Sequence, residues 1–190
     1  MPLTGHFDLI ASFYDRIFGL PSSGPLQELL ALPISGRLLD VGGGTGRVAQ
    51  TLRHQVGQII ILDNSAGMLQ QAIIKGLATV QGEVERLPFP DDCFSRILVV
   101  DALHHFRHQT QAARELLRVL SSQGRLVIEE PNVRRWAVKV VALAEKMALM
   151  RSHFSGLKRA AKLFEEWGGK VTFSKEEGFY FWLVVQKRND

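Results

Sequence analysis

Short apolar runs alternate with amphipathic stretches along the central part of this 190-residue chain. The runs are largely uncharged, which fits strands that are covered on both faces. They are expected as strands at residues 37–41, 58–63, 78–82, 94–100 and 124–129. Three amphipathic stretches lie among them and are expected as helices at 47–54, 66–75 and 109–120. This alternation predicts an α/β fold, with a parallel sheet between two layers of helices.

Further patterns flank this alternating region on both sides. Apolar residues recur at helical spacing in residues 6–18, 25–32, 133–150 and 157–167. Two strand-like runs at 170–174 and 179–187 then surround Gly178, close enough to pair as an antiparallel hairpin. We expect one domain over residues 1–190, in which residues 1–34 and 132–156 cover the site and contribute to substrate binding.

The composition fits a globular protein of one domain, because 46% of the residues are hydrophobic. The sequence has no apolar run of the roughly 20 residues that a membrane-spanning helix needs. Residues 1–13 lack a basic stretch followed by an apolar one, so no secretory signal is expected. Cys93 is the lone cysteine, which favours a reducing, cytoplasmic location. No Cys/His cluster has the spacing of a zinc site, so no metal is expected.

The formal net charge of +4 is concentrated late in the chain. Residues 131–170 contain nine Lys/Arg and three Glu, which is a local net charge of +6. Two interpretations of the helix at 133–150 stay open. It packs an apolar face on the sheet and leaves its basic face in solvent, or it makes a peripheral contact with an anionic membrane surface.

The most informative segment runs from Leu38 to Ala49, where an apolar run ends in Asp40 and a glycine-rich loop follows. Such a strand, tight loop and helix start together form a cradle for a polar ligand. The G-x-G-x-x-G pattern of dinucleotide sites fails at Arg47, and no Gly-Lys-Ser/Thr follows for a phosphate-binding P-loop. A carboxylate ahead of the glycines would repel a pyrophosphate and suits a cationic, amino-acid-bearing ligand.

Two later strand ends also carry candidate ligand-binding residues. Asp63 ends the second predicted strand, where an acid often holds ribose hydroxyls; alternatively it caps the next helix, as Ser65 can. Met68 either packs on an adenine ring or belongs to the core. Glu83 could accept from an adenine amino group, with the Val84 N–H donating to a ring nitrogen, or Glu83 lies in a surface loop.

Five motifs occur in order and at matching spacings. They are Asp-Val-Gly-x-Gly-Thr-Gly at residues 40–46, Asp-x-Ser-x-x-Met-Leu at 63–69, Gly-acid-x-Glu-x-Leu-Pro-Phe at 82–89, Leu-His-His-Phe at 103–106, and Arg-Val-Leu followed by Gly-x-Leu-Val-Ile-x-Glu-Pro at 118–131. The series resembles the class I S-adenosylmethionine-dependent methyltransferases, in particular the group of the ubiquinone and menaquinone C-methyltransferases. The resemblance implies a Rossmann-like three-layer sandwich with seven strands in the order 3-2-1-4-5-7-6, the last one antiparallel.

The resemblance also implies a cofactor, S-adenosylmethionine, with S-adenosylhomocysteine as the product. Asp40 would orient the methionine amino group, Asp63 would hold the ribose hydroxyls, and Asp101 and Ala102 would lie near the methionine end and the substrate entrance. The cofactor-binding residues that it implies are Asp40, Val41, Gly42, Gly43, Gly44, Thr45, Gly46, Asp63, Asn64, Met68, Glu83, Val84, Asp101 and Ala102.

The expected function is methyl transfer to a small, apolar or aromatic acceptor, of a lipid-like or quinone-like kind. A general base is needed only if the acceptor must lose a proton, and His104, His105 and Tyr14 are the candidate catalytic residues. Two alternatives stay open: a protein that binds S-adenosylmethionine without catalysis, and a nucleic-acid methyltransferase. The chain has no Asn/Asp-Pro-Pro-aromatic motif after the fourth strand, so no nucleic-acid partner is expected. The protein is expected to be a monomer or a homodimer.

Overall fold

The computed structural model describes residues 24–132 and 156–188. In these ranges a seven-stranded sheet has the order β3-β2-β1-β4-β5-β7-β6, as predicted. The strands are β1 (Ile34–Val41), β2 (Val56–Asp63), β3 (Ala78–Gln81), β4 (Phe94–Val100), β5 (Leu120–Pro131), β6 (Gly169–Glu177) and β7 (Tyr180–Lys187). The helices are α2 (Gly24–Leu30), α3 (Arg47–Leu52), α4 (Ala66–Ile74), α5 (Gln109–Val119) and α7 (Leu157–Glu165). The predicted helices at 6–18 and 133–150, with Tyr14, lie outside the described residues.

The direction of the strands also agrees with the prediction. β1 pairs in parallel with β2 and β4, β2 with β3, and β4 with β5. β7 is antiparallel to both of its neighbours, β5 and β6. The carboxyl ends of β1 to β5 therefore share one edge of the sheet with the first residues of β7, and ligands bind outside this edge in open α/β sheets.

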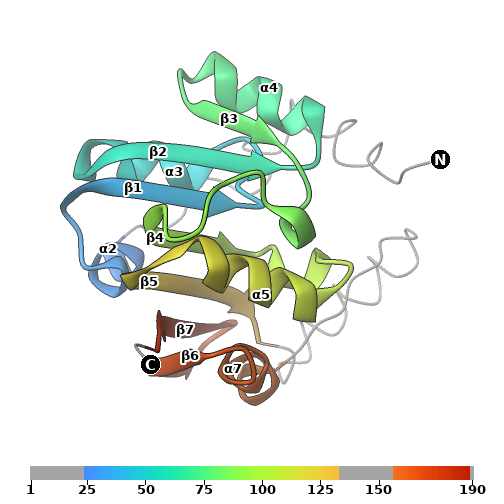
Figure 1. Ribbon diagram of the computed structural model, residues 1–190. Coiled ribbons are helices and arrows are strands. Elements are labelled where there is room, and N and C mark those ends of the chain that lie inside the picture. The colour runs from blue at the N-terminus through green and yellow to red at the C-terminus, as the bar shows by residue number, and fades with distance from the viewer. Residues whose placement is uncertain (1–23, 133–155, 189–190) are drawn as a thin grey trace.

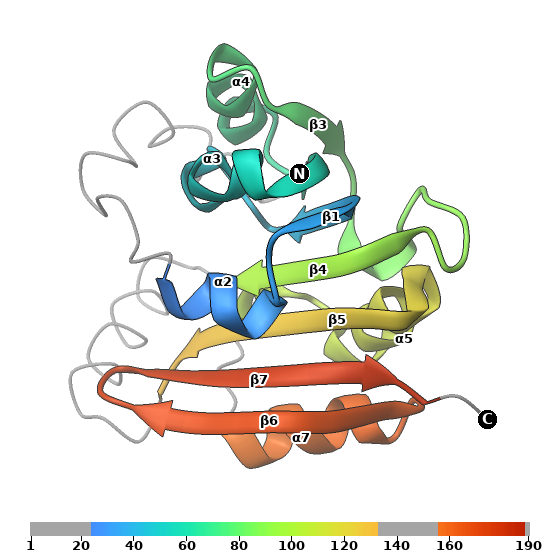
Figure 2. The same cartoon turned by 90° about the vertical axis from the view of Figure 1, so that its left-hand side faces the viewer.

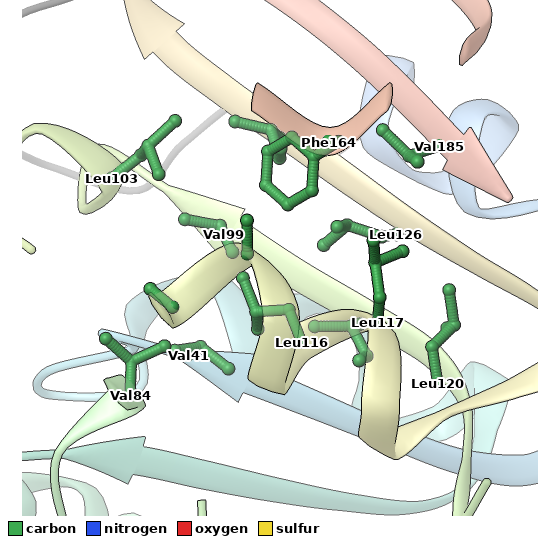
Figure 3. Close-up of a cluster of buried hydrophobic side chains, with 14 of the residues drawn as sticks. Val41, Val84, Val99, Leu103, Leu116, Leu117, Leu120, Leu126, Phe164 and Val185 are labelled. Atoms are coloured by element: carbon green, nitrogen blue, oxygen red, sulfur yellow. The ribbon is translucent and has the colours of Figure 1, made fainter. Parts of the chain in front are cut away.

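Helices cover both faces of the sheet and make three layers (Figures 1 and 2). α2, α3 and α4 pack on one face through fully or nearly fully buried residues such as Leu26, Leu52 and Leu69. α5 and α7 pack on the other face, where Leu116, Leu117 and Phe164 meet side chains of β4, β5 and β7 (Figure 3). The alternation of apolar runs in the sequence reflects this coverage on both faces.

The structure corrects several predicted boundaries. β5 begins at Leu120 instead of residue 124, because Phe94 pairs with Leu120 and Arg96 with Arg125, and the register shift between them accommodates the extra residues. β6 extends to Glu177 instead of residue 174. The charged residues at the end of β6 interrupt the apolar pattern that predicts a strand. Most of the strand is exposed because it lies at the sheet edge. Three short 3-10 helices were not predicted, among them η2 (Val84–Arg86) and η3 (Leu103–His105).

The described residues were also compared with the requirements of a membrane-spanning helix and of a metal site. No helix among them is long and apolar enough to cross a membrane. No group of three or more His, Cys, Asp or Glu side chains in residues 24–132 and 156–188 is arranged to hold a metal ion.

Candidate functional site

The glycine-rich loop connects the end of β1 to the start of α3 at the carboxyl edge of the sheet. Gly42, Gly44 and Gly46 all have positive φ, at 68°, 53° and 74°, a backbone conformation that favours glycine. The Gly42 N–H donates to the Leu62 carbonyl of β2 (2.7 Å), and the Gly46 N–H donates to the Gly43 carbonyl (2.9 Å). The loop is thus a tight, hydrogen-bonded turn, as the sequence predicts.

These glycines differ in what lies beside them. A Cβ atom on Gly42 would lie 2.5 Å from Ala102 Cβ, and one on Gly46 would lie 2.5 Å from Leu77 Cδ1. Both glycines therefore allow close packing of the protein against itself. Within the part of the chain that the structure describes, a Cβ atom on Gly44 would meet nothing closer than 3.9 Å, the distance to Asp63 Oδ2 and to Met68 Sδ. Gly44 is therefore the position of the three where the loop has room for a ligand.

Asp40 lies under this loop and is almost completely buried. Its Oδ2 atom is buried and has no hydrogen-bond partner among the described residues, and Gly43 is close enough that a Cβ atom there would lie 2.7 Å from this oxygen. Burial, and then the neighbouring charge of Asp63, raise the pKa of Asp40 to about 7, although Arg47 acts in the opposite direction. An unpartnered buried carboxylate is costly, so the site suits a cationic group such as an ammonium.

Asp63 connects the glycine loop to the start of the next helix. Its Oδ2 accepts from the Gly44 N–H (3.0 Å) and its Oδ1 accepts from the Ser65 N–H (2.9 Å). Ser65 caps α4 by accepting from the Met68 N–H (3.2 Å), as predicted. Asp63 therefore has a local structural role at the helix start, and its proposed role toward ribose hydroxyls stays a prediction.

The other predicted cofactor residues lie around the same edge. Met68 is buried and Asn64 is exposed, with the Asn64 carbonyl accepting from Gln81 Nε2 (3.0 Å). Thr45 is buried, and its carbonyl accepts from Lys75 Nζ (2.8 Å). Glu83 is exposed and precedes η2, whose first residue, Val84, is buried. The structure therefore brings the ends of β1, β2 and β3 together in the way that the motif spacing implies.

A second part of the site is the loop after β4. Asp101 has a positive φ of 51°, and its N–H donates to the Glu129 carbonyl (2.9 Å). Arg47 Nη2 lies 3.4 Å from Asp101 Oδ2, so the first residue of α3 is tied to this loop. The other oxygen, Oδ1, is buried, and no group in residues 24–132 and 156–188 forms a hydrogen bond with it. Burial, and then Glu130 and Glu129, raise the pKa of Asp101 to about 7.

Glu130 holds this loop in place from the neighbouring strand. Its Oε1 accepts from the N–H groups of Ala102 (2.8 Å) and Leu103 (2.7 Å), and its Oε2 lies 2.7 Å from His104 Nδ1. Both Glu130 and His104 are almost completely buried. His104 thus has a structural partner in Glu130, and Ala102, a predicted cofactor residue, is positioned by the same carboxylate.

The rings of His105 and His104 have centroids 4.0 Å apart and are tilted by 46°. Burial and then His104 lower the pKa of His105 to about 3. A base with so low a pKa is weak at neutral pH. The assignment of His104 or His105 as a general base stays a prediction. The pKa of Asp101, about 7, is better matched to that role than the pKa of His105.

Four residues near the site were not singled out from the sequence, Arg47, Glu129, Tyr180 and Trp182, and a fifth, Glu130, was recognised only as part of the last motif. The sequence presents Arg47 only as a departure from a glycine motif, and it presents the two glutamates as the polar end of an apolar run. Their roles depend on partners 26 to 54 residues away, as in His104–Glu130 and Arg47–Asp101. A single sequence does not show such pairings.

Comparison with known proteins places the chain among methyltransferases. A family model described as a methyltransferase domain matches residues 39–128. The ubiquinone/menaquinone biosynthesis C-methyltransferase UbiE of Pseudomonas fluorescens is 32% identical over 142 residues, which cover 65% of this chain. The match covers 56% of that relative, so the chain spans just over half of its length.

Two solved structures share the fold over nearly the whole chain. One, from Thermotoga maritima, is described as an S-adenosylmethionine-dependent methyltransferase and possible histamine N-methyltransferase; it has a TM-score of 0.79 and 22% identity and covers 96% of this chain and 98% of its own. The other was solved in complex with the Trm112 methyltransferase activator of Haloferax volcanii; it has a TM-score of 0.78 and 17% identity, with coverage of 97% and 98%. At these identities the likeness shows the fold alone.

The chain therefore has the fold of the class I S-adenosylmethionine-dependent methyltransferases, and its residues 39–128 match the model of a methyltransferase domain. Within this class it resembles the UbiE-like C-methyltransferases. S-adenosylmethionine is the cofactor that this domain implies, and the residues present fit it. The Asp40 carboxylate, one oxygen of which has no partner among the described residues, suits the ammonium group of its methionine part, and the backbone at Gly44 is not crowded by Asp63 or Met68.

Proposed function

We propose that this chain transfers the methyl group of S-adenosylmethionine to a small, apolar or aromatic acceptor. The main observation in support of the proposal is the buried Asp40 carboxylate next to the glycine loop. One of its oxygens has no hydrogen-bond partner among the described residues. S-adenosylmethionine, when bound, supplies an activated methyl group on a sulfonium centre. The protein then has to bind and orient the two reactants and exclude water.

The residues of the chain divide this work between them. Asp40 would pair with the ammonium of the cofactor, and Gly44 would allow the backbone to approach it. Asp63 would accept from the ribose hydroxyls while it holds the Gly44 and Ser65 N–H groups. Asp101 would take a proton from the acceptor where the acceptor must lose one, because a pKa of about 7 lets it gain or lose a proton at neutral pH.

The apolar or quinone-like character of the acceptor is supported by the relative in Pseudomonas fluorescens, whose name refers to ubiquinone and menaquinone biosynthesis. The segments expected to cover the acceptor, 1–34 and 132–156, lie largely outside the described residues, as does the basic helix 133–150 that would contact a membrane. We further propose a cytoplasmic location, for which the single free Cys93 is the support.

Two measurements on the purified chain test the function. Calorimetry should show binding of S-adenosylmethionine and S-adenosylhomocysteine, with a loss of at least about tenfold in Asp40→Asn, since a charge-assisted hydrogen bond contributes about 1.5–3 kcal/mol. Glu28→Gln, an exposed glutamate of α2, is the control and should bind normally. Radioactive methyl transfer to extracted small molecules should then be observed. A folded chain that binds neither ligand would contradict the proposal.

The same experiments distinguish the alternatives. Tight binding of S-adenosylmethionine without transfer to small molecules, lipids or quinols would favour the second candidate, a binding protein without catalysis. A nucleic-acid methyltransferase would transfer the label to RNA or DNA, with an affinity that falls steeply as salt rises.

A further inference from the structure

The carboxyl ends of β1 to β5 and the first residues of β7 form a row along one side of the sheet, and this row has two halves. The predicted cofactor residues lie at the ends of β1, β2 and β3 and in the loop after β4. The proposed function does not use the polar side chains on the other half, at the end of β5 and the start of β7. β7 is antiparallel to β5, so its first residues lie at the edge where β5 ends. This half carries Glu129, Tyr180 and Trp182.

These three side chains project from one face of the sheet. Glu129 is directly opposite Trp182 across the β5–β7 pair, and Tyr180 is two residues before Trp182; side chains two residues apart in a strand share a face. Trp182 Nε1 donates to Glu129 Oε2 at 2.5 Å. The rings of Tyr180 and Trp182 have centroids 6.3 Å apart and are tilted by 44°. The result is an aromatic wall with one carboxylate held against it.

This wall is coupled to the methionine half of the cofactor site. The Glu129 carbonyl accepts from the Asp101 N–H (2.9 Å), and Asp101 pairs with Arg47. The side chains influence one another as well: the pKa of Tyr180 is raised by burial, then by Asp101 and Glu129. The wall is therefore next to the place where the methyl group would be presented.

Glu129 has an oxygen to spare for a ligand. Among the hydrogen bonds that residues 24–132 and 156–188 make, its carboxylate accepts only the one from Trp182, and to Oε2. That bond fixes the orientation of the carboxylate, and the side chain is partly exposed. Tyr180 is 38% exposed, so the aromatic face beside the carboxylate is accessible too.

We propose that Glu129, Trp182 and Tyr180 form one wall of the acceptor site, and that the acceptor is an aromatic compound with an N–H or O–H group that donates to Glu129. This inference rests on the proposed function and adds a specificity-determining residue to it. The acceptor ring packs against Tyr180 and Trp182. Its donor group binds the free carboxylate oxygen in a charge-assisted hydrogen bond.

Binding of three matched probes to the protein saturated with S-adenosylhomocysteine tests the proposal. The probes are 2-phenylethylamine, which is a cationic donor, 4-ethylphenol, which is a neutral donor, and 4-ethylanisole, which has no donor. Saturation-transfer NMR titration should show that at least one of the two donor probes binds about tenfold or more tightly than the anisole, as expected for a hydrogen bond to a charged group.

Two variants at position 129 separate the two donor chemistries. Glu129→Gln removes the charge and keeps an oxygen acceptor, whereas Glu129→Leu removes both. An amine site loses its affinity for 2-phenylethylamine in both variants, and a hydroxyl site loses most of its affinity for 4-ethylphenol only in Glu129→Leu. Trp182→Phe keeps an apolar ring but removes the hydrogen bond to the carboxylate. It should therefore lower the affinity for the donor probe less than Glu129→Leu does. Glu177→Gln, on the same hairpin, is the control.

The outcome for S-adenosylhomocysteine separates this inference from the proposed function. If the wild-type chain does not bind it, the proposed function fails. If it binds normally to the wild type and to the Glu129 variants, three results would overturn the inference alone: equal affinity for all three probes, no binding of any probe, or donor probes that bind Glu129→Leu as well as wild type. Circular dichroism of each variant shows that it is folded.

Discussion

The guanidinium of Arg47 lies 3.4 Å from the carboxylate of Asp101 and joins the start of α3 to the loop after β4. The two segments are 54 residues apart in the chain. The two segments follow β1 and β4, which are neighbours in the sheet. Chain order runs away from this pair in opposite directions in the order β3-β2-β1-β4-β5, and ligands bind in α/β sheets at this point. Arg47 also lowers the pKa of both Asp40 and Asp101, whose values are otherwise raised by burial.

The first prediction concerns Arg47→Met, which removes this charge and keeps an apolar stem. The pKa values of Asp40 and Asp101 should rise further, because their cationic neighbour is lost. Since an ammonium group prefers an ionised Asp40, affinity for S-adenosylhomocysteine should increase with pH through about 7 in the wild type. In Arg47→Met this increase should occur at higher pH. Calorimetry from pH 6 to 9 measures it, with the exposed Arg53→Met as control, and identical profiles would contradict the prediction.

The second prediction concerns Asp63. Asp63→Ala removes the acceptor for the Gly44 and Ser65 N–H groups and, by the proposed function, the acceptor for the ribose hydroxyls. Affinity for S-adenosylhomocysteine should fall by about 1.5–3 kcal/mol or more. Asp63→Asn keeps one oxygen acceptor and should lose less. Calorimetry on both variants checks the order, and an alanine variant with unchanged affinity would exclude Asp63 from the site.

The third prediction concerns the pH dependence of stability. The pKa of Asp40 is about 7 in the folded protein and 3.8 for an ordinary aspartate, so the folded state binds more protons between these values. The free energy of unfolding should therefore fall as pH rises from about 4 to about 7. Asp40→Asn should flatten this slope but not abolish it, because Asp101 contributes in the same direction. Urea unfolding at several pH values measures the slope, and a variant as steep as the wild type would contradict the assignment.

The fourth prediction concerns Glu130, whose carboxylate takes part in three hydrogen bonds to the loop after β4. Glu130→Gln removes the charge from all three hydrogen bonds, and its amide can pair with His104 Nδ1 only if the histidine changes its tautomer. The free energy of unfolding should fall by about 1–3 kcal/mol, and affinity for S-adenosylhomocysteine should fall because Ala102 moves. Urea denaturation and calorimetry check both effects. A fully stable variant would show that the loop does not depend on Glu130.

The fifth prediction concerns His105. Burial and His104 lower its pKa to about 3, so its ring signals in NMR should not titrate between pH 5 and 8. A titration of His105 near pH 6.5 would show that the ring is hydrated, and would restore it as a strong candidate for the general base.

The sequence by itself determined the layered α/β architecture and the glycine loop. Apolar runs that alternate with amphipathic stretches have few folded solutions, because each strand must be covered on both faces. The strand order came from the motif series, which resembles a known family, and the structure confirms it. Ser65 was recognisable as a helix cap because its partner, Met68, is three residues away.

Only the tertiary structure decided which side chains surround the site. His104, a predicted catalytic residue, is buried against Glu130, and a Cβ atom on Gly42 or Gly46, two of the predicted cofactor-binding residues, would meet Ala102 or Leu77. Conversely, Arg47, Glu129 and Trp182 acquire roles from partners on distant strands. Local patterns record short-range hydrogen bonding and which face is buried. The identity of a partner across the sheet depends on how the strands are aligned with one another. This alignment cannot be recognised from the residue types of a single sequence.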